Sequence, residues 1–223
     1  MTQLALSRRR LLQISAAAAA AWQVAPWTDR VLSRFADAAS GTDDVVISTL
    51  EAFSDTLIPG AKRSADDRAI AGAASGPGAV QAGAVDLMQF PPAGIGPALP
   101  GLVAYLNTRA TAYAVQHGLV LDPTVPPFVS LSYTDRTNLA LELLDESAPD
   151  YLAWFALAAM PFLAYNTAGY LHTYEAVRAQ HPGLHAIGFP QPDTDNLWRF
   201  PEFSYGRALA SEHPGTTSTG NPP

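Results

Sequence analysis

A histidine and a carboxylate at helical spacing are the first candidates for chemistry in this 223-residue chain. His172 and Glu175 are three positions apart, so one face of a helix would present both. Carboxylate-bridged di-iron bundles use two Glu-x-x-His pairs and two further glutamates; here the order is reversed and no second pair exists. A surface or capped histidine is the favoured interpretation, and a metal at His172 and Glu175 is the alternative. His181 and His185 flank Pro182-Gly183, which interrupts helical geometry and predicts two loop residues.

Other catalytic patterns are incomplete. Residues 72–78 are glycine-rich but lack the lysine of a P-loop and a preceding strand, so we interpret them as a flexible loop. No Gly-x-Ser-x-Gly elbow occurs. The chain has no cysteine, which excludes thiolate catalysis, iron–sulfur clusters and zinc–thiolate sites. Asp66 and Asp67, next to Arg68, are interpreted as a solvated charge cluster. The sequence therefore indicates neither a catalytic set nor a cofactor of the chain's own.

Aromatic side chains near the C-terminus suggest a binding role. Trp198, Phe200, Phe203 and Tyr205 lie among prolines beside Arg199, and aromatic residues and arginine are the types that anchor protein interfaces. We expect an extended arm over residues 183–215. It would pack on its own bundle, on a partner subunit, or on both. Residues 216–223 are predicted to be disordered.

The N-terminal segment predicts export. Ser7-Arg8-Arg9-Arg10-Leu11-Leu12-Gln13 is close to the twin-arginine pattern, with Arg8 and Arg9 as the signal pair and Gln13 where lysine is usual. The following alanine-rich stretch is too short to span a bilayer, which takes about 20 apolar residues. We expect the translocation machinery to export the folded chain to the cell envelope or the exterior, or to the periplasm where there is an outer membrane. Cleavage could follow Ala21 or, the preferred site, Ala38.

The remaining chain is acidic. The formal charge is −7, and removal of residues 1–38 takes away five arginines and two aspartates, leaving eight basic and eighteen acidic side chains and a charge of −10. Such a surface repels phosphate backbones, so we expect no nucleic-acid partner. No basic amphipathic stretch survives cleavage, so we expect no stable membrane insertion. Residues 39–215 suit a single domain.

Apolar periodicity predicts an all-α fold. Val46, Leu50, Phe53 and Leu57 form the stripe of a first helix that ends at Pro59-Gly60. We expect about five helices joined by long loops rich in proline and glycine, with residues 121–130 extended. The helix segments are expected at about 43–57, 78–90, 102–118, 134–146 (capped by Thr134 and Asp135, with Leu139, Leu141, Leu143 and Leu144 buried) and 151–180, the last being one long helix, kinked at Pro161, or a broken pair.

The first helix also carries a family resemblance. Residues 49–60 read Thr-Leu-Glu-Ala-Phe-Ser-Asp-Thr-Leu-Ile-Pro-Gly and follow a twin-arginine leader. This combination resembles the small third subunit of gluconate 2-dehydrogenase-type enzymes, which share the Leu-x-x-x-x-Asp-x-Leu-Ile-Pro pattern. Residues 76–85, 197–201 and 204–207 are also similar to an uncharacterised exported family of actinobacteria.

The subunit resemblance implies a helper role. Small subunits of this kind accompany a large flavin-dependent oxidoreductase of the glucose–methanol–choline type and provide its export signal or folding support. FAD and the catalytic residues would then belong to the partner. A stand-alone exported helical enzyme, or a ligand- or metal-binding domain, is the alternative.

Overall fold

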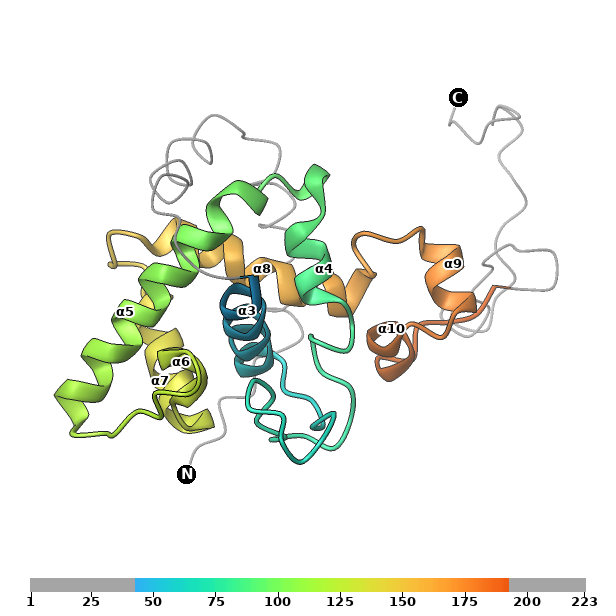
Figure 1. Ribbon diagram of the computed structural model, residues 1–223. Helices are drawn as coiled ribbons and strands as arrows, with labels where there is room; N and C mark the ends of the chain where they lie inside the picture. The colour runs from blue at the N-terminus through green and yellow to red at the C-terminus, as the bar shows by residue number, and fades with distance from the viewer. Residues whose placement is uncertain (1–42, 193–223) are drawn as a thin grey trace. The chain divides into compact units, whose positions relative to one another are not determined.

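The computed structural model describes residues 43–192, and every regular element in that range is helical, which confirms the all-α prediction. By its internal packing the chain forms two compact units, and the first of them ends at Ile187. The longest helices are the blue α3, the green α5 and the yellow-to-orange α8 (Figure 1). In chain order the elements are α3 (Asp43–Leu57), α4 (Ala84–Gln89), η1 (Pro91–Ala93), η2 (Gly96–Ala98), α5 (Leu99–His117), α6 (Pro127–Ser130), α7 (Tyr133–Leu143), α8 (Tyr151–Thr167), α9 (Thr173–Arg178) and α10 (Pro182–Ala186).

The core forms around α3. Leu50 and Phe53 are fully buried, as the apolar stripe predicted. The ring of Phe53 lies 6.2 Å from that of Phe128 in α6 and 6.3 Å from that of Trp154 in α8. Both pairs are tilted, which is a favourable arrangement for aromatic rings. α3 also packs on α4, α5 and α7, so it contacts most of the described helices.

α8 is the most apolar helix, and most of its surface is buried, in agreement with the expected central position. It continues through Pro161 and ends at Thr167, five residues before α9, so the broken pair is the correct alternative. A Cβ on Gly183 would lie 2.1 Å from the carbonyl oxygen of Tyr165, so α10 packs backbone to backbone on α8. None of the helices within residues 43–192 is long and apolar enough to cross a membrane.

Three segments differ from the prediction. α4 begins at Ala84 rather than near position 78, because residues 78–83 form turns and Gly83 has a φ of 78°. A short helix, α6, begins at Pro127 where an extended segment was expected. Another, α10, begins at Pro182 where the chain was expected to leave helix. The reason is the same in both cases, since proline has no N–H to lose at the first helical position.

The start of α7 also corrects the prediction. Ser132, rather than Thr134 or Asp135, is the N-cap: its hydroxyl accepts from the N–H of Asp135 and donates to the Asp135 carboxylate. Leu139 is buried as expected, whereas Leu141 is 61% exposed. Arg136, which the sequence did not predict to be buried, lies on the buried face of α7 with Leu139.

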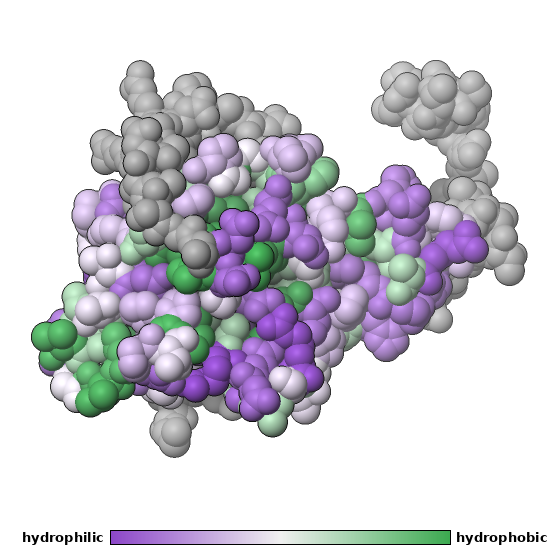
Figure 2. Space-filling model, in the orientation of Figure 1, coloured by the Kyte–Doolittle hydropathy of each residue, from purple (hydrophilic) through white to green (hydrophobic). Residues whose placement is uncertain are grey.

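The end of α5 exposes apolar side chains. Gly118 has a φ of 65°, and the N–H of Leu119 donates to the carbonyl of Ala114, which closes the helix in a Schellman turn. Val115, on the last turn, is 79% exposed, and Val120, just beyond it, is 97% exposed. Green side chains gather at this end of α5, at the lower left of Figure 2. We call Val115, Leu119 and Val120 the α5-end patch.

Candidate functional site

The segment between α3 and α4 crosses itself at two glycines. The N–H of Ala79 donates to the carbonyl of Ile58 (3.0 Å), and that of Ala61 donates to Gly76 (2.8 Å). A Cβ on Gly78 would lie 2.5 Å from the Gly60 nitrogen and 2.6 Å from the Ile58 oxygen. Both contacts are with backbone atoms, so this crossing requires glycine. The glycine-rich stretch is therefore bonded into the fold at this end rather than being only a loop.

Asp55, in the last turn of α3, holds both sides of this segment. Its side chain is 1% exposed and accepts from the N–H of Gly60 (3.0 Å) and from that of Ala71 (2.8 Å). Burial raises the pKa of the Asp55 carboxyl, and the two N–H donors and the charge of Arg136 only partly offset that effect. The aspartate of the Asp-x-Leu-Ile-Pro pattern is thus a main-chain clamp.

Arg136 is a second clamp. Arg136 is 3% exposed, and its guanidinium donates to four main-chain carbonyls. Burial lowers the pKa of Arg136 to about 10, which the negative charge of Asp55 partly opposes. These hydrogen bonds connect α7 to the segment between α3 and α4 and to the end of α6. The acceptors are the carbonyls of Ala69 (2.6 Å), Arg68 (2.9 Å), Leu131 (3.1 Å) and Val129.

Asp67 completes the set, and the prediction of a solvated charge cluster is wrong for this residue. It is 9% exposed and accepts from the N–H groups of Ala69 and Ile70 and from the guanidinium of Arg63 (2.7 Å). Burial alone would raise the pKa of Asp67, but these hydrogen bonds outweigh it and the pKa is lowered. Arg63 also pairs with both carboxylate oxygens of Glu51.

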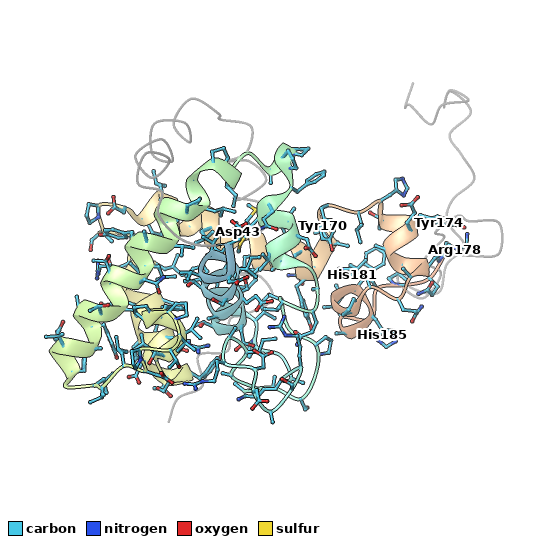
Figure 3. All side chains as sticks on the ribbon, in the orientation of Figure 1. Asp43, Tyr170, Tyr174, Arg178, His181 and His185 are labelled. Carbon is cyan, nitrogen blue, oxygen red and sulfur yellow. The ribbon has the colours of Figure 1, made fainter. Side chains whose placement is uncertain are left out.

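The histidines have structural positions. His172 precedes α9 as its N-cap residue and Glu175 lies in the first turn, and both are exposed. Within residues 43–192, no three His, Cys, Asp or Glu side chains form a group that could hold a metal. His181 is 6% exposed rather than on an open loop: Nε2 lies 3.0 Å from the carbonyl oxygen of Ala82 and Nδ1 accepts from Leu184. His185 is within α10 (Figure 3).

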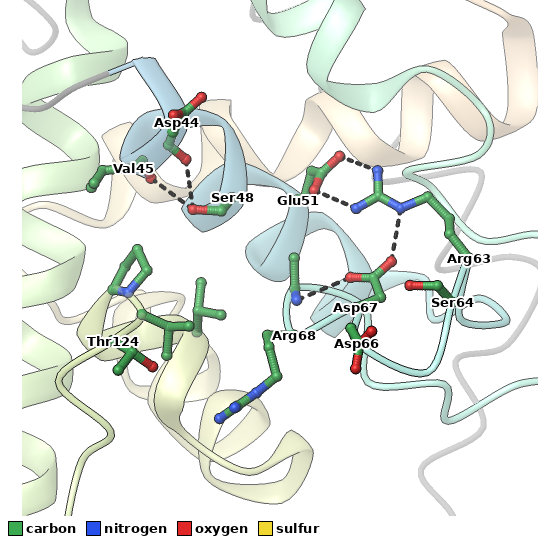
Figure 4. Close-up of a pocket in the computed structure, with 14 residues that line it drawn as sticks. Asp44, Val45, Ser48, Glu51, Arg63, Ser64, Asp66, Asp67, Arg68 and Thr124 are labelled. Carbon is green, nitrogen blue, oxygen red and sulfur yellow. Dashed lines mark hydrogen bonds and ion pairs between the residues drawn. The ribbon is translucent and has the colours of Figure 1, made fainter.

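A pocket of about 510 Å³ opens beside these clamps (Figure 4). Its apolar wall includes Val45, Val125 and Val129, and its polar wall includes Arg63 with both of its carboxylate partners. The pocket suits binding better than catalysis because the Arg63 guanidinium and the carboxylates of Glu51 and Asp67 already pair with one another. The lining residues are Asp44, Val45, Ser48, Glu51, Arg63, Ser64, Asp66, Asp67, Arg68, Ala69, Thr124, Val125, Pro126 and Val129.

The remaining predicted site residues lie outside the described range 43–192: Arg8, Arg9, Trp198, Phe200, Phe203 and Tyr205. Conversely, no sequence pattern predicted the clamps formed by Asp55 and Arg136. Asp55 is part of the pattern that carries the family resemblance, which was its one signal. Arg136 lies three residues before the buried Leu139, a spacing that places it on the same helix face.

Comparisons with known proteins establish the family. A search of curated proteins and a search of solved structures each gave no match. One family model, described as a family of unknown function, matches residues 44–223 and so covers nearly all of the chain beyond the predicted leader. On that match, the chain belongs to the family of unknown function DUF5987.

Proposed function

We propose that this chain is a non-catalytic accessory subunit that assists the export or assembly of a flavin-dependent dehydrogenase of the glucose–methanol–choline type. The large subunit holds the FAD and carries out the chemistry. The chain provides the twin-arginine signal through Arg8 and Arg9. A partner already loaded with its cofactor cannot be unfolded for export, which is why a folded-state route suits such a pair.

The observation that supports this role is the use of the buried ionisable groups. The buried Asp, Arg and His side chains within residues 43–192 are Asp55, Asp67, Arg136 and His181, and each one bonds main-chain atoms of the segments that join the helices. Catalytic groups need a free face toward a substrate. Side chains already occupied in this way favour a scaffold whose function is binding.

The test is purification of the tagged, exported chain from its native host, followed by a visible spectrum and mass spectrometry of the eluate. A flavin-bearing large chain at near one-to-one ratio is the expected result. A colourless, solitary protein under conditions in which the dehydrogenase is expressed would overturn the proposal.

The aromatic arm is the proposed contact in this complex. Trp198→Ala combined with Phe203→Ala should release the flavoprotein while the circular dichroism of the helices stays unchanged, because aromatic anchors dominate interface energy. Undiminished binding by this double variant would remove the arm from the interface and leave the accessory role intact.

A second candidate function is ligand or metal binding by a stand-alone domain, which the open pocket beside Arg63 favours. Metal analysis of the purified chain separates the two. Stoichiometric iron, manganese or zinc that disappears in a His172→Ala/Glu175→Ala variant would favour the stand-alone domain.

A further inference from the structure

The α5-end patch is exposed in a fixed shape. Single exposed apolar residues are ordinary, but here three occur within six positions, and Val120 is 97% exposed. The Schellman turn at Gly118 fixes the backbone of Leu119 to the last turn of α5, and Val120 follows directly after it. A surface that is already ordered loses little conformational entropy on binding, so this turn suits an interface.

The patch and the residues next to it in sequence contain no formally charged side chain. Residues 110–121 contain no Asp, Glu, Lys or Arg, although the chain as a whole carries −7. The charged residues at either end are already paired: Arg109 with Glu142 (3.5 Å) and Asp122 with Arg68 (3.1 Å). An uncharged apolar centre with a polar rim is the composition of protein interfaces.

Charge also selects the occupant. An anionic lipid surface attracts basic segments, and residues 110–121 contain none. A second copy would bring together two chains of the same negative sign, and net charge of one sign opposes self-association. A different protein with an uncharged apolar surface meets neither obstacle.

We infer that the α5-end patch docks the large flavoprotein subunit through an uncharged, apolar surface of that partner. This inference rests on the proposed function and adds to it a contact on the described helices, separate from the aromatic arm. The partner covers Val115 and Val120 and leaves the paired charges of Arg109 and Asp122 at the rim.

The experiment compares two double variants in the affinity purification. Val115→Ser/Val120→Ser removes two exposed apolar side chains from the patch. Leu152→Ser/Leu171→Ser is the matched control, because it removes two exposed apolar side chains (43% and 40% exposed) from segments outside the patch and the arm. Retained flavin per chain is read from the visible spectrum, the Kd by titration with the isolated large subunit, and the fold by circular dichroism.

We expect the patch variant to raise the Kd about tenfold or more, with an unchanged fold, and the control to bind as the wild type does. Wild-type affinity in the patch variant, or equal loss in both variants, overturns the inference while the accessory role stands. A wild-type dimer that the patch variant converts to monomer, or binding to phosphatidylserine vesicles that it abolishes, assigns the patch to another occupant and also overturns it. Absence of any flavin-bearing chain with the wild type overturns the inference and the proposed function together.

Discussion

The segment around Asp55 and Arg136 and the end of α5 distribute their polarity in opposite ways. The first buries charged groups and satisfies them with main-chain N–H and carbonyl groups. The second exposes valines in residues 110–121, which contain no Asp, Glu, Lys or Arg. Polar groups that are hydrogen-bonded within the protein stabilise its fold. Apolar groups exposed to water instead favour binding, because covering them with a partner lowers the free energy. The comparison therefore separates architecture from binding.

Loss of the Arg136 guanidinium should have the largest effect. Arg136→Met preserves much of the side-chain volume but leaves four carbonyls without this donor, so we expect a loss of about 3–5 kcal/mol in the free energy of unfolding. Urea denaturation measures it. Arg109→Met is the control, because that exposed arginine makes one ion pair and its loss should cost no more than about 1 kcal/mol. Equal losses in the two variants would refute the clamp.

Substitution at the glycine crossing should have the second-largest effect on stability. Gly78→Ala places a methyl group against the backbone of Ile58 and Gly60, and we expect a loss of about 1–3 kcal/mol. Gly76→Ala, two residues earlier, meets no atom within 4 Å, so it should change stability by less than about 0.5 kcal/mol. Thermal unfolding of the two variants checks this. A Gly78→Ala variant as stable as the wild type would show that the crossing can accommodate a Cβ.

The two buried carboxylates should respond to pH with opposite signs. The folded-state pKa of Asp67 is lowered, so its contribution is present above the ordinary value of 3.8 and is lost as the pH falls through the lowered value. The Tm difference between the wild type and Asp67→Asn should therefore shrink in acid.

For Asp55 the folded-state pKa is raised, so ionisation opposes folding above that value and the penalty disappears as the pH falls toward 3.8. The Tm advantage of the wild type over Asp55→Asn should therefore grow in acid. Thermal scans from about pH 7 to about pH 3 measure both variants. Parallel curves for the two variants would contradict the assigned pKa directions.

The smallest stability effect should be at the α5-end patch. Val120→Ser changes a side chain that is 97% exposed, so the free energy of unfolding should move by less than about 0.5 kcal/mol. Chemical denaturation checks this, and a loss above about 1 kcal/mol would mean that the valine supports the fold. A stable variant with weakened partner binding would sharpen the contrast with Arg136.

Local pattern predicted the larger helices because their apolar stripes run on for several turns. The stripe through Leu50 and Phe53 located α3, and the apolar run from Tyr151 located α8. The short helices α6 and α10 were not predicted, because they have only four and five residues and begin at prolines, which otherwise indicate irregular chain. Leu141 was assigned to the core because a run of leucines does not reveal which one faces solvent.

By itself, the sequence determined the helical class, the first helix with its end at Leu57, and the absence of cysteine chemistry, because composition and local backbone preference act within a few residues. Tertiary structure alone decided the rest. Asp55 contacts Ala71 sixteen residues away, Arg136 contacts Ala69 at a separation of 67, and His181 contacts Ala82 at a separation of 99. Periodicity has no information at such separations, so whether a charged side chain clamps the main chain or faces water depends on which distant backbone groups packing brings to it.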